Sequence, residues 1–306
     1  MNTPSMQLHT KGYLCGLGAV IIWTGFIVVS RMGGISALFA NDIIAIRYAT
    51  CAVLLLPLWW FKYRVNLLDP KILLISTIGG IGYASCAFRG FSLAPASHAA
   101  VLLPGLMPLF ITLLSTLLLK EKPSLLKWFG IIIITIGALT LLTQGTGADS
   151  DVGAGQAWLI AATICWSLFS VLVKRWNISP WEAVISVAII SSIIYLPTYA
   201  LFLSSNIAET PWQDIAIQVV YQGFLATIVQ LVLYVRAMHI IGASSMGTLM
   251  ALVPMLAGIA AVFLLDEPFG APLAIGILLV SAGSIATQRT NNKQTIPSVP
   301  PAPSRS

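Results

Sequence analysis

The chemistry that this sequence offers starts with two tryptophans, Trp23 and Trp166, which lie near the middle of long apolar segments. They share a local pattern, WTGF in one segment and WSLF in the other. A buried indole N–H needs a hydrogen-bond partner, and tryptophan in membrane helices normally prefers the hydrated interface. The partner could be a neighbouring helix, which would make the pair structural, or a solute in an internal pathway. Both interpretations stay open from the sequence.

Several polar and charged side chains also fall in or near apolar segments. Arg89 and Arg236 lie close to segment ends, where an arginine either extends to the lipid headgroups or pairs with a carboxylate. Arg47 follows Asp42 by five residues and could pair with it structurally or act at a gate. Ten residues are our candidates for a substrate pathway: Trp23, Thr24, Tyr83, Arg89, His98, Trp166, Tyr221, Gln230, Tyr234 and Arg236.

A histidine and three prolines mark two of the apolar segments. His98 follows Ser97, which could cap a helix there, and a purely structural interfacial histidine is the alternative. Pro104, Pro108 and Pro254 interrupt apolar segments and free backbone carbonyls that other groups must satisfy. With Arg47, these prolines are candidates for structural kinks or gating positions.

The elements that must position these residues are membrane helices. The 306 residues are 58% hydrophobic and only 8% charged, with a mean hydropathy of +0.91, whereas soluble domains carry about 25% charged residues. About 20 apolar residues cross a bilayer as a helix. The sequence predicts an all-α integral membrane protein with ten transmembrane helices, near 12–30, 38–61, 71–92, 97–119, 125–143, 154–174, 180–204, 213–236, 243–265 and 270–287.

One pattern occurs twice in the chain. Pro108 and Glu121 enclose twelve residues, and Pro254 and Glu267 enclose twelve residues at an offset of 146. Glycines follow each copy at matching positions: Gly130 and Gly137, then Gly276 and Gly283. The two tryptophan strings match at an offset of 143. We interpret the chain as a duplicated unit.

The duplication divides the chain into two related five-helix repeats. We place the first at residues 12–144 and the second at 155–288, with a linker at 145–154 on the outer side. Residues 1–11 and 289–306 are expected to be cytoplasmic tails, the second of them disordered because it is polar and proline-rich. Five is an odd number of crossings, so the second repeat enters from the opposite side and the repeats are inverted.

The positions of the charges set the expected orientation. Of the 16 Lys and Arg, all except Arg31, Arg47 and Arg89 fall in segments on the same side as the N-terminus. The positive-inside rule places that side in the cytoplasm, so both termini are expected there. The net charge of +6 is then explained by the orientation of the protein in the membrane. It gives no reason to expect a nucleic-acid partner.

Catalytic and metal chemistry are not visible in the sequence. The four cysteines lie in apolar segments without a C-x-x-C spacing, so neither a disulfide framework nor a metal site is supported. There is no G-x-x-x-x-G-K-[ST] loop for ATP, and no paired carboxylate, Cys/His or Ser/His arrangement. We expect no catalytic residue, no metal and no cofactor.

The residues above resemble a known family. The Arg47-Tyr48 pair before Pro57, together with the two Pro-to-Glu motifs, is similar to the EamA branch of the drug/metabolite transporter superfamily. The resemblance covers residues 12 to 288. It implies a bacterial inner-membrane permease with ten helices, many relatives of which export amino acids or other small metabolites.

The expected function is a secondary transporter that moves a small organic metabolite across the bacterial inner membrane by alternating access, with export as the favoured direction. Inverted repeats of this kind hold their sites near the midplane at the repeat interface. An amino acid or a derivative would suit arginines near a pathway. An importer is the alternative within this class, and a non-transporting membrane scaffold or enzyme is the alternative outside it. The expected partners are the lipid bilayer and the small-molecule substrate, and a homodimer is compatible with this plan.

Overall fold

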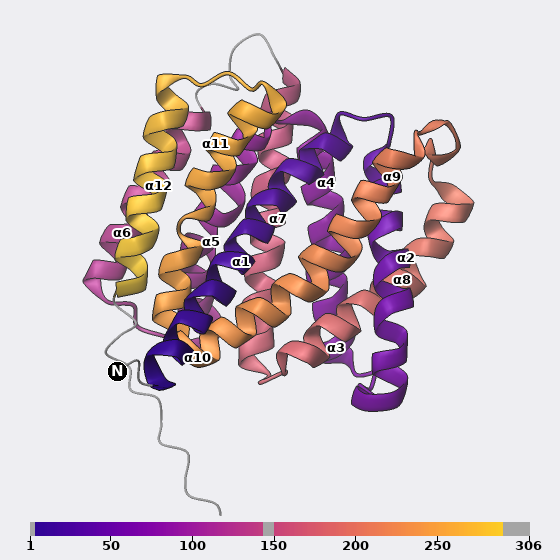
Figure 1. Ribbon diagram of the computed structural model, residues 1–306, viewed down its shortest axis with the longest axis horizontal. Helices are drawn as coiled ribbons and strands as arrows, with labels where there is room; N and C mark the ends of the chain where they lie inside the picture. The colour runs from indigo at the N-terminus through magenta and orange to yellow at the C-terminus, as the bar shows by residue number, and fades with distance from the viewer. Residues whose placement is uncertain (1–3, 143–149, 290–306) are drawn as a thin grey trace, which may run out of the picture.

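The protein is a bundle of long helices that run between two ends (Figure 1). The computed structural model describes residues 4–142 and 150–289, which are helical apart from short connections and contain no strand. In the first half the elements are α1 (Pro4–Gly34), α2 (Ala40–Leu58), η1 (Trp59–Tyr63), α3 (Pro70–Ser76), η2 (Thr77–Gly82), α4 (Tyr83–Leu93), α5 (Ala96–Leu119) and α6 (Leu125–Leu142).

The second half repeats this order. Its elements are α7 (Ser150–Arg175), α8 (Pro180–Phe202), η3 (Ile207–Glu209), α9 (Trp212–Gln218), η4 (Val219–Val229), α10 (Gln230–Met250), α11 (Val253–Leu265) and α12 (Ala271–Arg289). The short π-helical stretches η2 and η4 interrupt corresponding segments, between α3 and α4 and between α9 and α10. We call the end of the bundle at which α1 begins the N-terminal end, and the opposite end the far end.

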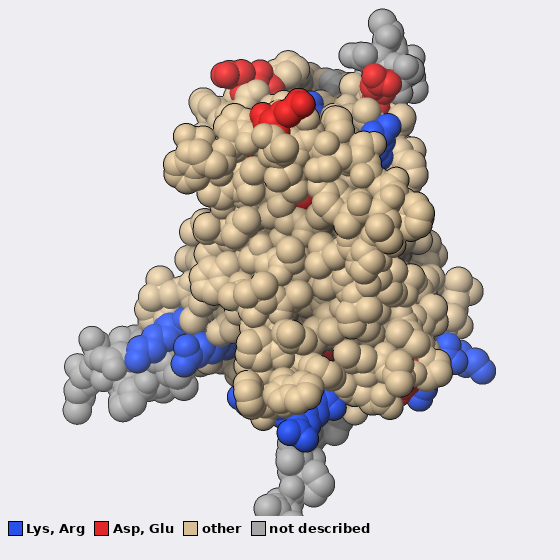
Figure 2. Space-filling model, turned by 90° about the vertical axis from the view of Figure 1, so that its right-hand side faces the viewer, with Lys and Arg blue, Asp and Glu red and all other residues tan. Residues whose placement is uncertain are grey.

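Eight helical segments in the described part of the chain are long and apolar enough to cross a membrane, and two shorter apolar helices accompany them. The short helices correspond to α6 and α12. All ten coincide with the segments expected from the sequence, so the molecule is an all-helical membrane protein. Figure 2 shows that, on the face in view, Lys and Arg gather mostly at the N-terminal end and Asp and Glu at the far end.

The repeated Pro-to-Glu motif ends each copy with the same local geometry. Lys120 closes α5 at φ 56°, and Asp266 closes α11 at φ 52°. Their backbone N–H groups return to Ser115 O and Ala261 O, which are again 146 residues apart. A non-glycine residue with positive φ is uncommon, so two at matching positions indicate that the motif encodes a specific helix end.

The repeated glycines form a seam between α6 and α12, which lie side by side (Figure 1). A Cβ placed on Gly283 would lie 2.6 Å from Gly130 O, and one on Gly276 would lie 3.0 Å from Gly137 O. Small residues allow membrane helices to approach to backbone contact. The glycines that follow each motif are therefore explained by packing.

Helix starts and proline positions differ in part from expectation. α1 begins at Pro4 and α7 at Ser150, so helix extends into the expected tail and linker. Gly242, at φ 84°, breaks α10 where the sequence places the boundary between the segments 213–236 and 243–265. Pro254 opens α11 after a turn, whereas Pro104 and Pro108 lie inside a continuous α5 and do not interrupt it. The expected tail residues 1–3 and 290–306 and linker residues 145–149 lie outside the described part.

Candidate substrate cavity

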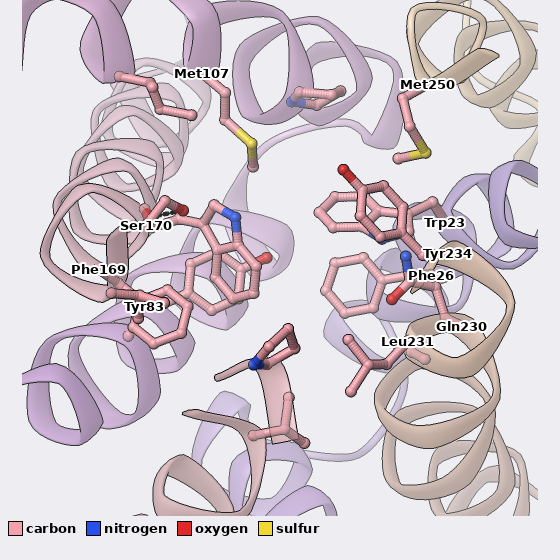
Figure 3. Close-up of a pocket in the computed structure, with 18 of the residues that line it drawn as sticks. Trp23, Phe26, Tyr83, Met107, Phe169, Ser170, Gln230, Leu231, Tyr234 and Met250 are labelled. Atoms are coloured by element: carbon pink, nitrogen blue, oxygen red, sulfur yellow. Dashed lines mark hydrogen bonds between the residues drawn. The ribbon is translucent and has the colours of Figure 1, made fainter. Parts of the chain in front are cut away.

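A central cavity of ≈ 700 Å³ lies between the two halves. Small-molecule sites commonly measure about 300–1,000 Å³, so this one has the size for a metabolite. Figure 3 shows its walls facing each other across open space, with Tyr83, Phe169 and Ser170 on one side. Trp23 and Tyr234 lie on the other side (Figure 3). The lining is mainly aromatic and aliphatic, with a few polar groups.

Aromatic rings from both halves form a continuous cluster on the cavity wall. The centroids of Trp23 and Trp166 are 6.4 Å apart with an interplanar angle of 75°. Trp166 also contacts Tyr83 at 5.0 Å and Phe169 at 5.3 Å, while Trp23 contacts Phe26 at 5.9 Å. Neither indole N–H donates to another group within the described residues. The indoles therefore remain free to donate to a solute.

Much of the cavity wall consists of residues at equivalent positions of the two halves. The offsets found in the sequence relate several lining residues pairwise: Trp23 with Trp166, Phe26 with Phe169, Gly79 with Ala226, Tyr83 with Gln230, and Pro108 with Pro254. Each half thus contributes an equivalent set of elements, α1, η2, α4 and α5 from one and α7, η4, α10 and α11 from the other. The cavity lies at the junction between these sets.

Arg47 brings a positive charge to this wall. Its Nη1 donates to Gln222 Oε1 across 3.4 Å, and its guanidinium lies 5.8 Å from the Phe26 ring centroid. Asp42, the partner considered from the sequence, is fully buried and accepts hydrogen bonds from Phe39 N, Tyr199 Oη and Asn206 N. No salt bridge joins Arg47 to a carboxylate in the described part of the chain.

A polar contact joins the halves at the far end of the bundle, outside the cavity lining. Glu267, from the α11–α12 connection, accepts hydrogen bonds from Ala96 N at 2.6 Å and Ser97 N at 2.9 Å. Its Oε1 lies 3.9 Å from Arg31 Nε, and Arg31 donates to Phe91 O at 2.8 Å. The two charged side chains are only 18% and 9% exposed. Glu267, and not Ser97, therefore caps α5.

The cavity extends toward the N-terminal end. Lys127 and Pro180, in the first turns of α6 and α8, line it together with Thr287 near the end of α12. Here Lys174 Nζ lies 2.7 Å from Glu121 Oε1, with side-chain exposures of 65% and 37%. This pair matches Arg31 and Glu267 by position, since the offsets are 143 and 146. The ion pair at the far end is thus more buried than the equivalent pair at the N-terminal end.

The structure places five of the ten pathway candidates on the cavity wall and five away from it. Those on the wall are Trp23, Tyr83, Trp166, Gln230 and Tyr234. Arg47, Pro104, Pro108 and Pro254, considered as structural or gating residues, also line it. Their roles in transport stay predictions.

The five other candidates have different surroundings. Arg89 and Arg236 are exposed and lie off the wall. His98 is buried against Gln156, whose Nε2 lies 3.0 Å from its Nδ1. Tyr221 donates to Ile22 O at 3.3 Å, and Thr24 buries its hydroxyl without a hydrogen-bond partner among the described residues.

A helical membrane protein with an internal, solute-sized cavity between its two halves has the architecture of a membrane transporter. The chain belongs to the EamA-like transporter family, whose model matches it twice, over residues 10–143 and 153–288. Membership in this family points to a transporter and away from an enzyme, and it places the chain in a lipid bilayer as a multi-pass protein.

Similar proteins are also named as transporters. The chain is 26% identical over 238 residues to the uncharacterized transporter YyaM of Bacillus subtilis, covering 72% of this chain and 76% of YyaM. It is 25% identical to YetK of the same organism, covering 72% of this chain and 68% of YetK. A solved crystal structure with 20% identity has a TM-score of 0.61 and covers 94% of this chain and 99% of that chain, so it shares the fold.

Proposed function

We propose that this protein is a secondary transporter of ten membrane helices, arranged as two inverted five-helix repeats, that moves a small organic metabolite by alternating access. The bacterial inner membrane is the proposed location, and export is the favoured direction. The observation that carries the proposal is the cavity itself, which is walled by equivalent residues of both halves and extends toward the N-terminal end.

The pairing of helices supports the two-repeat plan. α1 packs on α10 as α7 packs on α4, and α5 packs on α7 as α11 packs on α1. The pairs α2 with α8, α5 with α11 and α6 with α12 each join equivalent helices of the two halves. Such reciprocity is expected when two related units are joined about a pseudo-two-fold axis.

The two ion pairs supply a mechanism for changing access. Both pairs are formed here and differ in exposure, so if the halves exchange their conformations, Lys174 and Glu121 would become buried at the N-terminal end while Arg31 and Glu267 become exposed. The Lys and Arg of the N-terminal end support a cytoplasmic position for it. The present conformation then opens to the cytoplasm and is closed toward the outside.

Transport is tested by flux in liposomes that contain the purified protein. A panel of radiolabelled amino acids, organic acids and amines is offered from either side, and protein-free liposomes give the background. Saturable flux of at least one solute is expected. If every solute on the panel moves at the background rate in both directions, the proposal is wrong and a scaffold becomes the better explanation.

Orientation has its own test. A fluorescent protein and alkaline phosphatase are each fused at the N-terminus and after Thr287. The fluorescent fusions are expected to fluoresce, and the phosphatase fusions are expected to be inactive, because both positions are assigned to the cytoplasm. Phosphatase activity from either fusion would contradict the assigned topology without bearing on transport.

A further inference from the structure

The electrostatic character of the cavity limits what it can bind. Arg47 and Lys127 are its charged lining residues, and no Asp or Glu is among the lining residues that the structure describes. The carboxylates nearest in sequence to these cations are occupied elsewhere: Asp42 by Tyr199 and backbone N–H groups, and Glu121 by Lys174. Arg47 therefore brings to the wall a positive charge with which no carboxylate in the described part of the chain forms a salt bridge.

Arg47 has unused hydrogen-bonding capacity. A guanidinium carries five N–H donors in a planar fork, and to the residues that the structure describes Arg47 donates only one hydrogen bond, at the long distance of 3.4 Å. Guanidinium fits a carboxylate with two parallel hydrogen bonds. A partly buried charge without a counterion is costly, and an anionic ligand would remove that cost.

The other half offers no equivalent charge. Position 187, which corresponds to Arg47 at the offset of 140, is a valine, and it also lines the cavity. The cation is thus confined to one side, while the aromatic cluster around Trp23 and Trp166 covers the adjoining wall. A ligand with one anionic group and an apolar, ring-sized body matches this distribution.

We infer that the cavity binds amphipathic organic anions, with Arg47 holding the carboxylate and the aromatic cluster holding the apolar body. The inference rests on the proposed function for the role of the site, and it narrows the substrate class from amino acids to acids that lack an ammonium group. An ammonium would find no carboxylate on this wall, and cation–π contact with the aromatic rings contributes only about 0.5–2 kcal/mol.

Four compounds of one skeleton test this inference by calorimetric titration of the full chain in nanodiscs. The probes are 3-phenylpropionate (anion), phenylalanine (zwitterion), phenethylamine (cation) and 3-phenylpropanamide (neutral). We expect 3-phenylpropionate to bind at least about tenfold more tightly than the amide, as a charge-assisted hydrogen bond implies. Equal binding of acid and amide, or tighter binding of the amine or of phenylalanine, would overturn the inference.

Variants locate the anion site. Arg47→Gln is expected to weaken 3-phenylpropionate binding by about 10- to 100-fold and to leave the amide unchanged, whereas Arg47→Lys should keep a preference for the anion. Arg175→Gln removes an exposed arginine away from the cavity and should leave both affinities as in the wild type. An unchanged preference for the anion in Arg47→Gln would show that Arg47 is not its ligand.

The result separates this inference from the proposed function. Flux of amines or neutral solutes without anion binding would refute the inference and keep the transporter. Anion binding that depends on Arg47, in a protein that shows no flux of any solute, would keep the site and refute transport.

Discussion

The ring of Trp23 meets the ring of Trp166 edge to face, with centroids 6.4 Å apart, and the two residues occupy equivalent positions in the two halves. The contact therefore joins α1 to α7 across the junction of the repeats and forms part of the cavity wall. Any movement of one half against the other must change this contact.

Replacing either tryptophan is expected to impair transport without preventing folding. Trp23→Ala and Trp166→Ala each remove part of the wall, and flux of the best panel solute should fall at least about tenfold if a substrate stacks there, since aromatic pairs and buried rings contribute about 1–3 kcal/mol. The double variant should show less than the sum of the two effects, because the residues touch. Flux in liposomes, normalised to the amount of folded protein, is the measurement.

Trp212→Ala is the matched control, since this tryptophan is 72% exposed and lies outside the cavity. Wild-type flux in both Trp23→Ala and Trp166→Ala would contradict the assignment of these residues to the pathway.

Removing the carboxylate of Glu267 is expected to destabilise the protein. Glu267→Ala leaves two N–H groups of α5 without their acceptor and Arg31 without its counterion, which costs about 1–2 kcal/mol. The thermal unfolding midpoint in detergent should fall accordingly. Glu121→Ala, the same change at the equivalent position, removes a solvent-accessible ion pair and should cost below about 1 kcal/mol. Equal losses of thermal stability in the two variants would contradict the expected contribution of burial to the Glu267 contacts.

Asp42 provides a second comparison between equivalent positions. Asp42→Ala strips the acceptor from three donors, Phe39 N, Tyr199 Oη and Asn206 N, in a fully buried environment. A buried donor left unsatisfied costs about 1–3 kcal/mol, so a marked loss of thermal stability is expected. Glu182→Ala breaks only an exposed capping box with Ser179 and should cost less than half as much. A larger loss in Glu182→Ala would contradict this ranking.

Side chains on the glycine seam should not be tolerated. Gly283→Ala places a methyl group 2.6 Å from Gly130 O, so α6 and α12 must separate, at a cost of about 1–3 kcal/mol. Leu278→Ala, on the exposed side of α12, is the control and should be close to neutral. Size-exclusion profiles and unfolding midpoints measure both, and a fully stable Gly283→Ala would exclude backbone contact at the seam.

The sequence predicted the helices well because each is an uninterrupted apolar run of the length a bilayer requires, and fixed offsets identified Trp23 and Trp166 as equivalent positions. It left open whether Arg47 pairs with Asp42, although helical geometry argues against that pair, since residues five apart do not share a helix face. The cap that Glu267 places on α5 could not be predicted, because it joins segments 170 residues apart whose proximity depends on the packed bundle.

The glycine seam has the same pattern from either side, since Gly130 meets Gly283 and Gly137 meets Gly276. An interface of this kind is isologous, so two identical copies of a single half could in principle form it. When the two halves are joined in one chain, their sequences no longer have to be identical. One half can then carry Arg47 where the other carries Val187, so the cavity has a charge asymmetry that a dimer of identical halves could not have.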